Sequence, residues 1–332
     1  MKTLFAIVVF IGLAFESSNL VGQIYDDPNK VDDDYVYQGE YFGELDTAAG
    51  LMKIGMQVIA LGEGNFKGVG YHGGLPGDGW DGEAPSRSKG SLESGQVTFE
   101  NDHIVAVLAD EKIEFRLSDG TELGAIEKIE RTSPTLGKEP PEGAVVLFDG
   151  ETTDNFVSTK KGQPARMTDD GLLMQGANSN HLFNDCQLHI EFRLPYQPTA
   201  SGQQRGNSGV YLQGRYEVQM LDSFGLAGEH NECGGIYSIR KPDENMCFPP
   251  LTWQTYDIDF VAAKFNDSGE KVSNARLTVK HNGVVIHDDV ELPNTTTAAP
   301  LKESAEKGYL HLQDHGNPVR YRNIWLVETE EE

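Results

Sequence analysis

The sequence predicts an all-β protein in which a smaller β domain precedes a C-terminal two-sheet antiparallel sandwich. Short runs in the C-terminal half alternate apolar and polar residues, which is typical of strands with one face on a core. Turn-rich pieces separate these runs, and no segment has a strong 3.6-residue period. The chain has 332 residues, which suits two domains of ~100–200 residues each.

The clearest alternation is at 188–194 (Leu-His-Ile-Glu-Phe-Arg-Leu), where the apolar residues occupy the even positions. The same pattern recurs at 209–213, 216–220, 256–260, 277–280 and 309–313. Asn282-Gly283 predicts a tight hairpin turn, because both residues tolerate the positive φ that such turns need. We therefore expect the second domain, residues 145–328, to be a β-sandwich.

The first half of the chain predicts three further regions. Residues 23–37 are rich in aspartate, so we expect a disordered acidic leader. Residues 38–130 contain apolar runs at 57–61, 66–71 and 104–108 between turn-rich pieces, which predicts a small antiparallel β domain of unknown role. Residues 131–144 carry three prolines and are the expected linker.

Residues 1–22 have the pattern of a secretory signal peptide. Lys2 precedes an apolar run from Leu4 to Ala14, and small residues follow near Gly22. The alternative is a buried N-terminal strand or helix. The run is shorter than the ~20 apolar residues that span a bilayer. We expect a secreted or periplasmic protein without membrane insertion.

Charge and cysteine content exclude several classes of function. The net charge of −25 repels nucleic acid and anionic lipid, whereas a neutral carbohydrate substrate is not disfavoured. Cys186, Cys233 and Cys247 are an odd set, so either Cys233 and Cys247 form a disulfide or all three are buried thiols. The cysteines and histidines lack the spacing of a zinc site.

The polar positions of the predicted strands carry an unusual set of side chains. An ordinary solvated face is mostly Lys, Glu, Ser and Thr, whereas this one is rich in groups that can hydrogen-bond sugar hydroxyls. Its members are His189, Glu191, Arg193, Tyr211, Gln213, Glu217, Gln219, His311 and Gln313. This pattern favours a sugar-binding surface over a hydrophilic face with paired charges.

Several motifs resemble the 3-keto-disaccharide hydrolase family, also described as 3-keto-glucoside lyase and 2-hydroxy-3-keto-glucal hydratase. The central signature is 206–212 (Gly-Asn-Ser-Gly-Val-Tyr-Leu) followed by 215–222 (Arg-Tyr-Glu-Val-Gln-Met-Leu-Asp). Residues 147–150, 253–257 and 312–325 match further motifs in the same order. The resemblance covers about 145–327 and implies a concanavalin-like jelly roll.

The resemblance also implies a reaction. A ketone at C3 of a glycosyl unit acidifies the hydrogen at C2, so a general base can start β-elimination of the C1 substituent. Water then adds to the 2-hydroxy-3-keto-glucal, and the net result is hydrolysis of a 3-keto-glycoside. The route does not need the two opposed carboxylates of ordinary glycoside hydrolysis.

The candidate catalytic residues are Glu217 and His315, and their acid and base roles stay open. Arg193 or Arg215 could stabilise the enolate. The other candidate substrate-binding residues are Glu191, Tyr211, Gln213, Gln219 and Gln313. We expect Glu191, Glu217, Gln219, Gln313 and His315 to converge in one concave hollow.

A divalent metal ion is a separate hypothesis, with Asp222 and Glu191 as candidate ligands, although no ligand spacing indicates one. The alternative function is a non-catalytic carbohydrate-binding module, because the same fold serves that role. A third is a structural or adhesion protein. Glu217 and His315 favour the enzyme, since passive binding of a neutral sugar does not need them.

Overall fold

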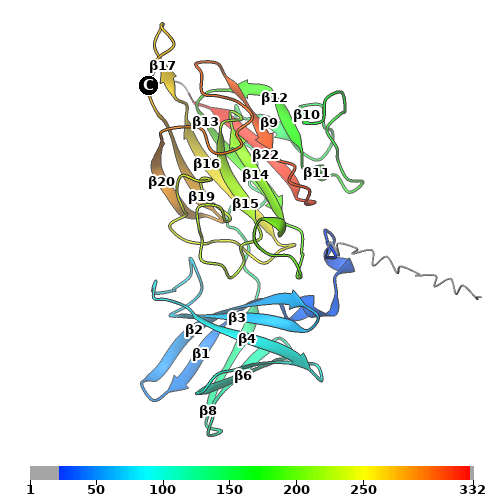
Figure 1. The fold of residues 1–332 in the computed structure, drawn as a ribbon, viewed down its shortest axis with the longest axis vertical. Coiled ribbons are helices and arrows are strands. Elements are labelled where there is room, and N and C mark those ends of the chain that lie inside the picture. Colours follow the sequence, from blue (N-terminus) through cyan, green and yellow to red (C-terminus); the bar gives the residue numbers. More distant parts are fainter. Residues whose placement is uncertain (1–21, 330–332) are drawn as a thin grey trace, which may run out of the picture.

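The structure, a computed structural model, describes residues 22–329. The predicted signal peptide, 1–22, lies outside these residues apart from Gly22. Within the described residues, no helix has both the length and the apolar character needed to cross a membrane. The protein is all-β, with a barrel domain and a sandwich domain (Figure 1).

The first domain is a closed antiparallel barrel of eight strands in sequential order. Its strands are β1 (Gly39–Thr47), β2 (Gly50–Gly62), β3 (Asn65–His72), β4 (Ser86–Glu93), β5 (Gln96–Glu100), β6 (Ile104–Ala109), β7 (Lys112–Leu117) and β8 (Glu122–Ile129). β8 pairs back onto β1, with Glu40 opposite Ile129, which closes the barrel. The predicted β domain is confirmed, and its closure removes the unpaired sheet edges that an open sheet would expose.

The residues before the barrel are ordered, so the prediction of a disordered leader is wrong. They contain the short 3₁₀ helices η1 (Pro28–Lys30) and η2 (Asp33–Tyr37). Tyr25 forms a β-bridge with Tyr196 of the sandwich and stacks on its ring. The Tyr196 hydroxyl also donates to Asp32 Oδ1 at 3.0 Å. The aspartate-rich composition concealed these aromatic contacts, which hold the leader against the second domain.

The second domain is a sandwich of two antiparallel sheets, as predicted. The five-stranded sheet has the order β10 (Phe156–Ser158), β12 (Ala177–Phe183), β21 (Gly308–Leu312), β14 (Asn207–Leu212) and β15 (Tyr216–Leu221). The seven-stranded sheet has the order β11 (Leu173–Met174), β22 (Arg320–Glu328), β13 (Cys186–Arg193), β16 (Trp253–Val261), β19 (Ala275–His281) and β20 (Val284–Leu292), with β9 (Val145–Phe148) also paired to β22. The remaining elements are the hairpin of β17 (Lys264–Phe265) and β18 (Lys271–Ser273), and the 3₁₀ helix η3 (Gly202–Gln204).

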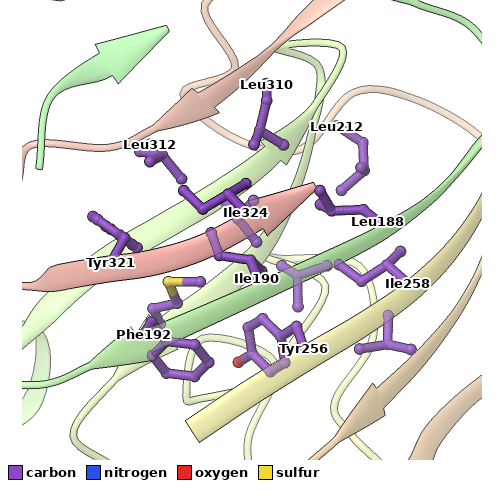
Figure 2. Packing of buried hydrophobic residues seen from close by; sticks show 14 of the residues in the cluster. Leu188, Ile190, Phe192, Leu212, Tyr256, Ile258, Leu310, Leu312, Tyr321 and Ile324 are labelled. Atoms are coloured by element: carbon purple, nitrogen blue, oxygen red, sulfur yellow. The ribbon is translucent and has the colours of Figure 1, made fainter. Parts of the chain in front are cut away.

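The apolar halves of the alternating strands meet between these sheets. Leu188, Ile190 and Phe192 of β13 face Val210 and Leu212 of β14, and belong to one buried cluster with them (Figure 2). The remaining positions of each strand therefore point to the two opposite outer faces of the sandwich. The predicted hairpin turn at Asn282-Gly283 is confirmed, with φ of 50° and 82° between β19 and β20.

The two domains touch through a loop that follows β15. Phe224 is 2% exposed and lies in one apolar cluster with Ile59, Val69, Tyr71 and Leu75 of the barrel domain. Beside it, Arg87 Nη1 donates to the Gly225 carbonyl at 3.1 Å. The barrel therefore supports the segment at which β15 ends.

Candidate active site

Four polar side chains form a row across the outer face of the five-stranded sheet. Tyr211 on β14 is the register partner of Glu217 on β15 on one side and of His311 on β21 on the other. His311 is in turn the partner of Asn178 on β12. Neighbouring strands lie ~4.8 Å apart, so the backbones at Glu217 and His311 are about 10 Å apart. The row therefore places two titratable groups on either side of a phenol.

Glu217 is the most perturbed carboxyl of this face. It is 2% exposed, and burial raises its pKa to about 8, although a hydrogen bond with Tyr211 partly opposes the rise. Its backbone is held on both sides, because Glu217 N donates to Thr296 Oγ1 and its carbonyl accepts from Tyr237 N. At neutral pH most Glu217 side chains are therefore protonated.

Gly209 makes room for this carboxyl group. A Cβ at position 209 would lie 2.1 Å from Glu217 Oε1, well inside contact distance. The φ of Gly209 is not in the left-handed region, so the backbone does not require glycine there. The glycine is needed because the Glu217 side chain lies flat across β14.

The pKa of His311 is shifted so as to favour its neutral form as well, but by a decrease instead of an increase. Burial lowers its pKa to about 4, so the imidazole is neutral at pH 7. Its Nδ1 lies 2.7 Å from Asn178 Oδ1, and since a carbonyl oxygen can only accept, Nδ1 carries the proton. Nε2 is then a hydrogen-bond acceptor. The ring also meets Tyr211 edge-on, with centroids 5.0 Å apart.

Amide side chains surround the row. Gln313 Nε2 donates to the Tyr211 hydroxyl at 3.0 Å. With its amide turned so that the nitrogen faces Glu217, Gln219 donates to Glu217 Oε1 at 3.0 Å. Gln313, His311 and Asn178 are only partly buried, so the row is accessible to solvent on their side, whereas Tyr211 and Glu217 are covered. The predicted residues Tyr211, Glu217, Gln219 and Gln313 are thus brought together.

His315 is placed close to the face but not on it. It lies in the loop between β21 and β22, two residues beyond Gln313, and is exposed. A hydrogen bond from Gly316 N to Asp314 Oδ1 at 3.1 Å stabilises the turn of this loop. The catalytic role predicted for His315 stays a prediction.

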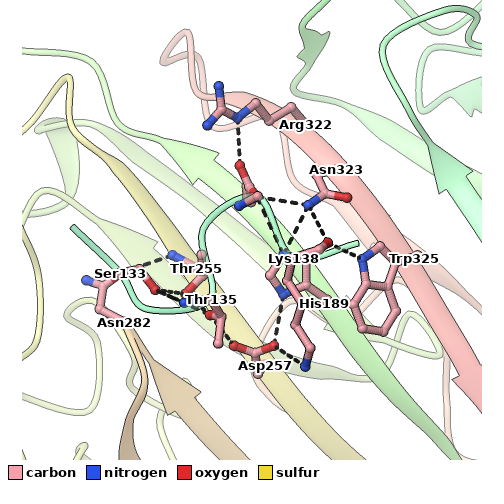
Figure 3. A network of polar contacts seen from close by, with 12 residues as sticks. Ser133, Thr135, Lys138, His189, Thr255, Asp257, Asn282, Arg322, Asn323 and Trp325 are labelled. Atoms are coloured by element: carbon pink, nitrogen blue, oxygen red, sulfur yellow. Dashed lines mark hydrogen bonds and ion pairs between the residues drawn. The ribbon is translucent and has the colours of Figure 1, made fainter. Parts of the chain in front are cut away.

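Glu191 and Arg193 do not belong to this site, so the expected single hollow is wrong. Both lie on β13 in the other sheet, and their side chains point to the opposite outer face. The two carboxylate oxygens of Glu191 accept from Arg322 Nε at 2.6 Å and from Asn323 Nδ2 at 2.9 Å (Figure 3). Arg193 Nη2 donates to the Asp26 carbonyl of the leader. Glu191 and Arg193 therefore hold other parts of the chain in place.

The linker covers this opposite face and explains the set of polar residues there. Gly137 N donates to Glu191 Oε1 at 2.5 Å, and Thr135 Oγ1 donates to Asp257 Oδ2 at 2.7 Å. His189 lies between Asp257, 2.8 Å from Nδ1, and Glu191, 3.6 Å from Nε2 (Figure 3). This network fixes the linker on the seven-stranded sheet.

Gln213 and Arg215 hydrogen-bond other parts of the chain and do not have the sugar-binding positions that the sequence predicts. Gln213 adopts a φ of 54° in the β14–β15 turn, and its amide donates to the Phe183 carbonyl. Arg215 donates to Gln213 Oε1, to the Lys302 carbonyl and to Ser304 Oγ. With these donors used, the guanidinium holds the 302–306 loop in place.

The candidate metal ligands do not converge. Asp222 follows β15, where Oδ2 accepts from Arg205 Nε at 2.7 Å, whereas Glu191 is paired with Arg322 in the other sheet. In the part of the chain from 22 to 329, no three or more His, Cys, Asp or Glu side chains are arranged to hold a metal ion. The three cysteines are buried free thiols.

Comparison with known proteins agrees with this architecture. Residues 143–327 match the profile of the 3-keto-alpha-glucoside-1,2-lyase-like domain, which covers more than half of the chain. The chain belongs to this family. Membership of the family places it among carbohydrate-active enzymes.

Solved structures are similar to part of this chain. A candidate glycosyl hydrolase from Parabacteroides distasonis ATCC 8503 is 35% identical, with 57% of this chain and 85% of that chain covered and a TM-score of 0.53. A second one from the same organism is 17% identical, with 57% and 95% covered and a TM-score of 0.43. A comparison with curated proteins found no match.

His311 belongs to the candidate site although its sequence position assigns it no role beyond the polar face. Alternation does not show which strands are neighbours, so it cannot place His311 beside Tyr211. Asn178 was overlooked for the same reason. The available signal was the polar position in Leu310-His311-Leu312, two residues before Gln313.

Proposed function

We propose that this enzyme cleaves 3-keto-glycosides by β-elimination and then hydrates the 2-hydroxy-3-keto-glucal. The supporting observation is the pair of opposite pKa shifts in one row, with Glu217 raised to about 8 and His311 lowered to about 4. At neutral pH the carboxyl is protonated and the imidazole is a free base. Groups whose surroundings push their pKa values apart commonly mark the acid and base of a site.

In this proposal His311 Nε2 removes the proton from C2 of the sugar. The electron pair of the C2–H bond forms the enolate, whose negative charge lies on the C3 oxygen. Protonated Glu217, held by its hydrogen bond with Tyr211, is a donor that can hydrogen-bond this oxygen. The C3 carbonyl then reforms, the electron pair forms the C1=C2 double bond, and the C1–O bond breaks. The leaving oxygen takes the proton that His311 removed from C2.

Hydration completes the reaction. Water adds at C1 of the glucal and a proton returns to C2, so the glycoside and one water give 3-keto-glucose and an alcohol. The site carries this out with neutral groups, which suits a neutral substrate and a protein of net charge −25. Secretion to the periplasm or outside the cell, as the N-terminal residues predict, is part of the proposal.

Isotope incorporation tests the mechanism. The purified protein is incubated with a 3-keto-disaccharide in deuterated water, and the product is analysed by NMR. We expect released 3-keto-glucose labelled at C2. Unlabelled product would indicate direct displacement, and sugar binding without turnover would indicate a carbohydrate-binding module.

Variants at the row test the roles of its residues. We expect His311→Ala to lower turnover by ~10²–10⁴-fold, as for loss of a general base. His103→Ala, at an exposed position of the barrel domain, is the matched control and should leave turnover unchanged. Near-normal turnover in the folded His311 variant would assign the base to another group, with His315 the next to replace.

A further inference from the structure

The barrel domain contains a cavity that the sugar chemistry does not use. Its volume is about 300 Å³, and residues from all eight strands line it. The lining includes Leu45, Met52, Ile54, Met56, Phe99, Ile104, Ala106, Phe115 and Leu123. An eight-stranded barrel is just wide enough either to be filled by its own side chains or to hold one small ligand.

One end of this barrel is filled and the other is hollow. Val58, Ala60, Phe66, Val97 and Leu108 are buried in the core toward the Gly62–Asn65 end. The cavity lies toward the opposite end, where β1 reaches Thr47 and β3 reaches His72.

Small inward-facing residues leave the space open. Gly70 on β3 is the register partner of Ser86 on β4, and Ser88 and Ala106 lie farther along the same lining. None of these side chains is large enough to fill the interior opposite Phe99. The hollow therefore follows from residue size along the strands.

The polar groups near the cavity are mostly paired already. Ser86 Oγ donates to the Gly70 carbonyl, Thr47 Oγ1 donates to the Gly50 carbonyl, and His72 pairs with Asp81. Arg87 is directed to Gly225 of the sandwich. No carboxylate pairs with Arg87 in the described residues, but the Glu100 carboxylate belongs to the same lining. The two opposite charges leave the lining without a net charge, so an ionic ligand of either sign would lose its hydration without a matching counter-charge.

We propose that the barrel binds one neutral, largely apolar small molecule in this cavity. Its volume lies at the lower end of the ~300–1,000 Å³ range of ligand pockets. Most of the lining surface is apolar, so an apolar ligand that enters the cavity removes apolar surface from water. The barrel is then a second binding site, separate from the face that carries Glu217.

A matched pair of fluorescent probes tests the proposal on the full chain. N-phenyl-1-naphthylamine is neutral, and 8-anilinonaphthalene-1-sulfonate is the same ring system with a sulfonate. We expect saturable one-to-one binding of the neutral probe, tighter than that of the sulfonate by roughly tenfold or more. Non-saturating fluorescence, or equal or tighter binding of the sulfonate, would overturn the proposal.

Filling the cavity provides the second test. Ala106→Phe adds a ring inside the barrel, whereas Val107→Phe adds the same ring on the outward side of β6. We expect at least roughly tenfold weaker binding of the neutral probe by the first variant and unchanged binding by the second. Ser88→Phe fills the cavity from another wall and replaces Ala106→Phe if that variant does not fold. Unchanged binding in a folded filled variant would contradict the assignment.

Discussion

At the scale of single residues, the site depends on one carboxyl group whose protonation is set by its surroundings. Glu217 is covered on a sheet face of neutral side chains, and burial raises its pKa to about 8. His311, two strands away, is neutral because burial lowers its pKa to about 4. Neither shift follows from residue type, since each depends on how much water the neighbouring strands exclude.

The pH dependence of catalysis follows from these two values. The proposed mechanism needs protonated Glu217 as a donor and neutral His311 as a base, so kcat/KM should fall as the pH rises past about 8 and as it falls below about 4. A rate that instead rises through pH 8 would make ionised Glu217 the base.

Two variants of Glu217 distinguish these roles. If Glu217 is a donor, Glu217→Gln keeps a donor and should be faster than Glu217→Ala. If ionised Glu217 is the base, the two variants should lose the same activity. Exposed Glu151→Gln is the control.

Gly209→Ala tests whether the position of this carboxyl matters. The added Cβ would lie 2.1 Å from Glu217 Oε1, so the side chain must leave its place across β14. We expect turnover to fall by at least ~10²-fold, comparable with the loss of one oxyanion donor. A double-mutant cycle measures the coupling between the two positions. It compares the turnover of Gly209→Ala, of Glu217→Ala and of the variant that carries both substitutions. Additive losses would show that Gly209 does not act through Glu217.

At the scale of elements, the sequence predicted the strands but not how they are assigned to the two sheets. Alternation located β13, β14, β15 and β21 within one or two residues and separated their apolar from their polar positions. It could not show that β13 and β14, consecutive in the sequence, lie in different sheets, because a jelly-roll connection crosses between layers. Glu191 and Glu217 were therefore predicted in one hollow although they lie on opposite faces.

The family signature marks the hairpin that carries most of the candidate site, which alternation alone does not single out. Residues 206–212 and 215–222 form the hairpin of β14 and β15, which carries Tyr211, Glu217 and Gln219. Long-range pairing with β21 was needed to bring His311 and Gln313 beside them. The barrel's closure was equally hidden, because contact between β1 and β8 joins residues far apart in the sequence.

The linker network on the seven-stranded sheet gives a stability prediction. Burial alone would raise the pKa of Glu191, but hydrogen bonds from His189, Asn323, Arg322 and Gly137 lower it to about 2. Burial would lower the pKa of His189, yet hydrogen bonds with Asp257 and Glu191 raise it. We expect Glu191→Gln to reduce the free energy of unfolding by about 1–2 kcal/mol, because Arg322 loses its charge partner but its side chain is 37% exposed and can be solvated by water. Turnover per folded molecule should be unchanged, and Asp259→Asn on the same face is the control.

The pH range in which this network stabilises the protein follows from the directions of the Glu191 and His189 pKa shifts. The Glu191 contribution is fully present above its unfolded value of 4.5 and is lost as the pH falls toward about 2. The His189 contribution is fully present below its unfolded value of 6.5 and is lost as the pH rises through its raised pKa. Between pH 4.5 and 6.5 both contributions hold the linker in place, so trypsin should cleave after Lys138 most slowly there. The cleavage rate at each pH is divided by the activity of trypsin on a small substrate at the same pH. A cleavage rate that does not change with pH would show that the linker is held by other contacts.

At the scale of the whole molecule, the two domains are joined by more than the linker. The leader bridges to the sandwich at Tyr196, the linker lies on the seven-stranded sheet, and Phe224 enters the apolar cluster of the barrel domain. Phe224 lies only a few residues beyond Glu217 and Gln219, in the loop that leaves β15. Packing against the barrel therefore limits how far the end of β15 can move.

Phe224→Ala should uncouple the domains. Truncating a buried phenylalanine removes about 3–5 kcal/mol of packing energy, and here the loss falls on the contact between the domains. We expect calorimetry to show two separated unfolding transitions in the variant where the intact protein shows one coupled transition, because neither domain would then stabilise the other. Leu182→Ala removes an exposed side chain of β12 and serves as the control. If the transitions stay coupled in Phe224→Ala, the leader and the linker suffice to join the domains. The KM of the variant for the keto-sugar would then show whether β15 has become more mobile.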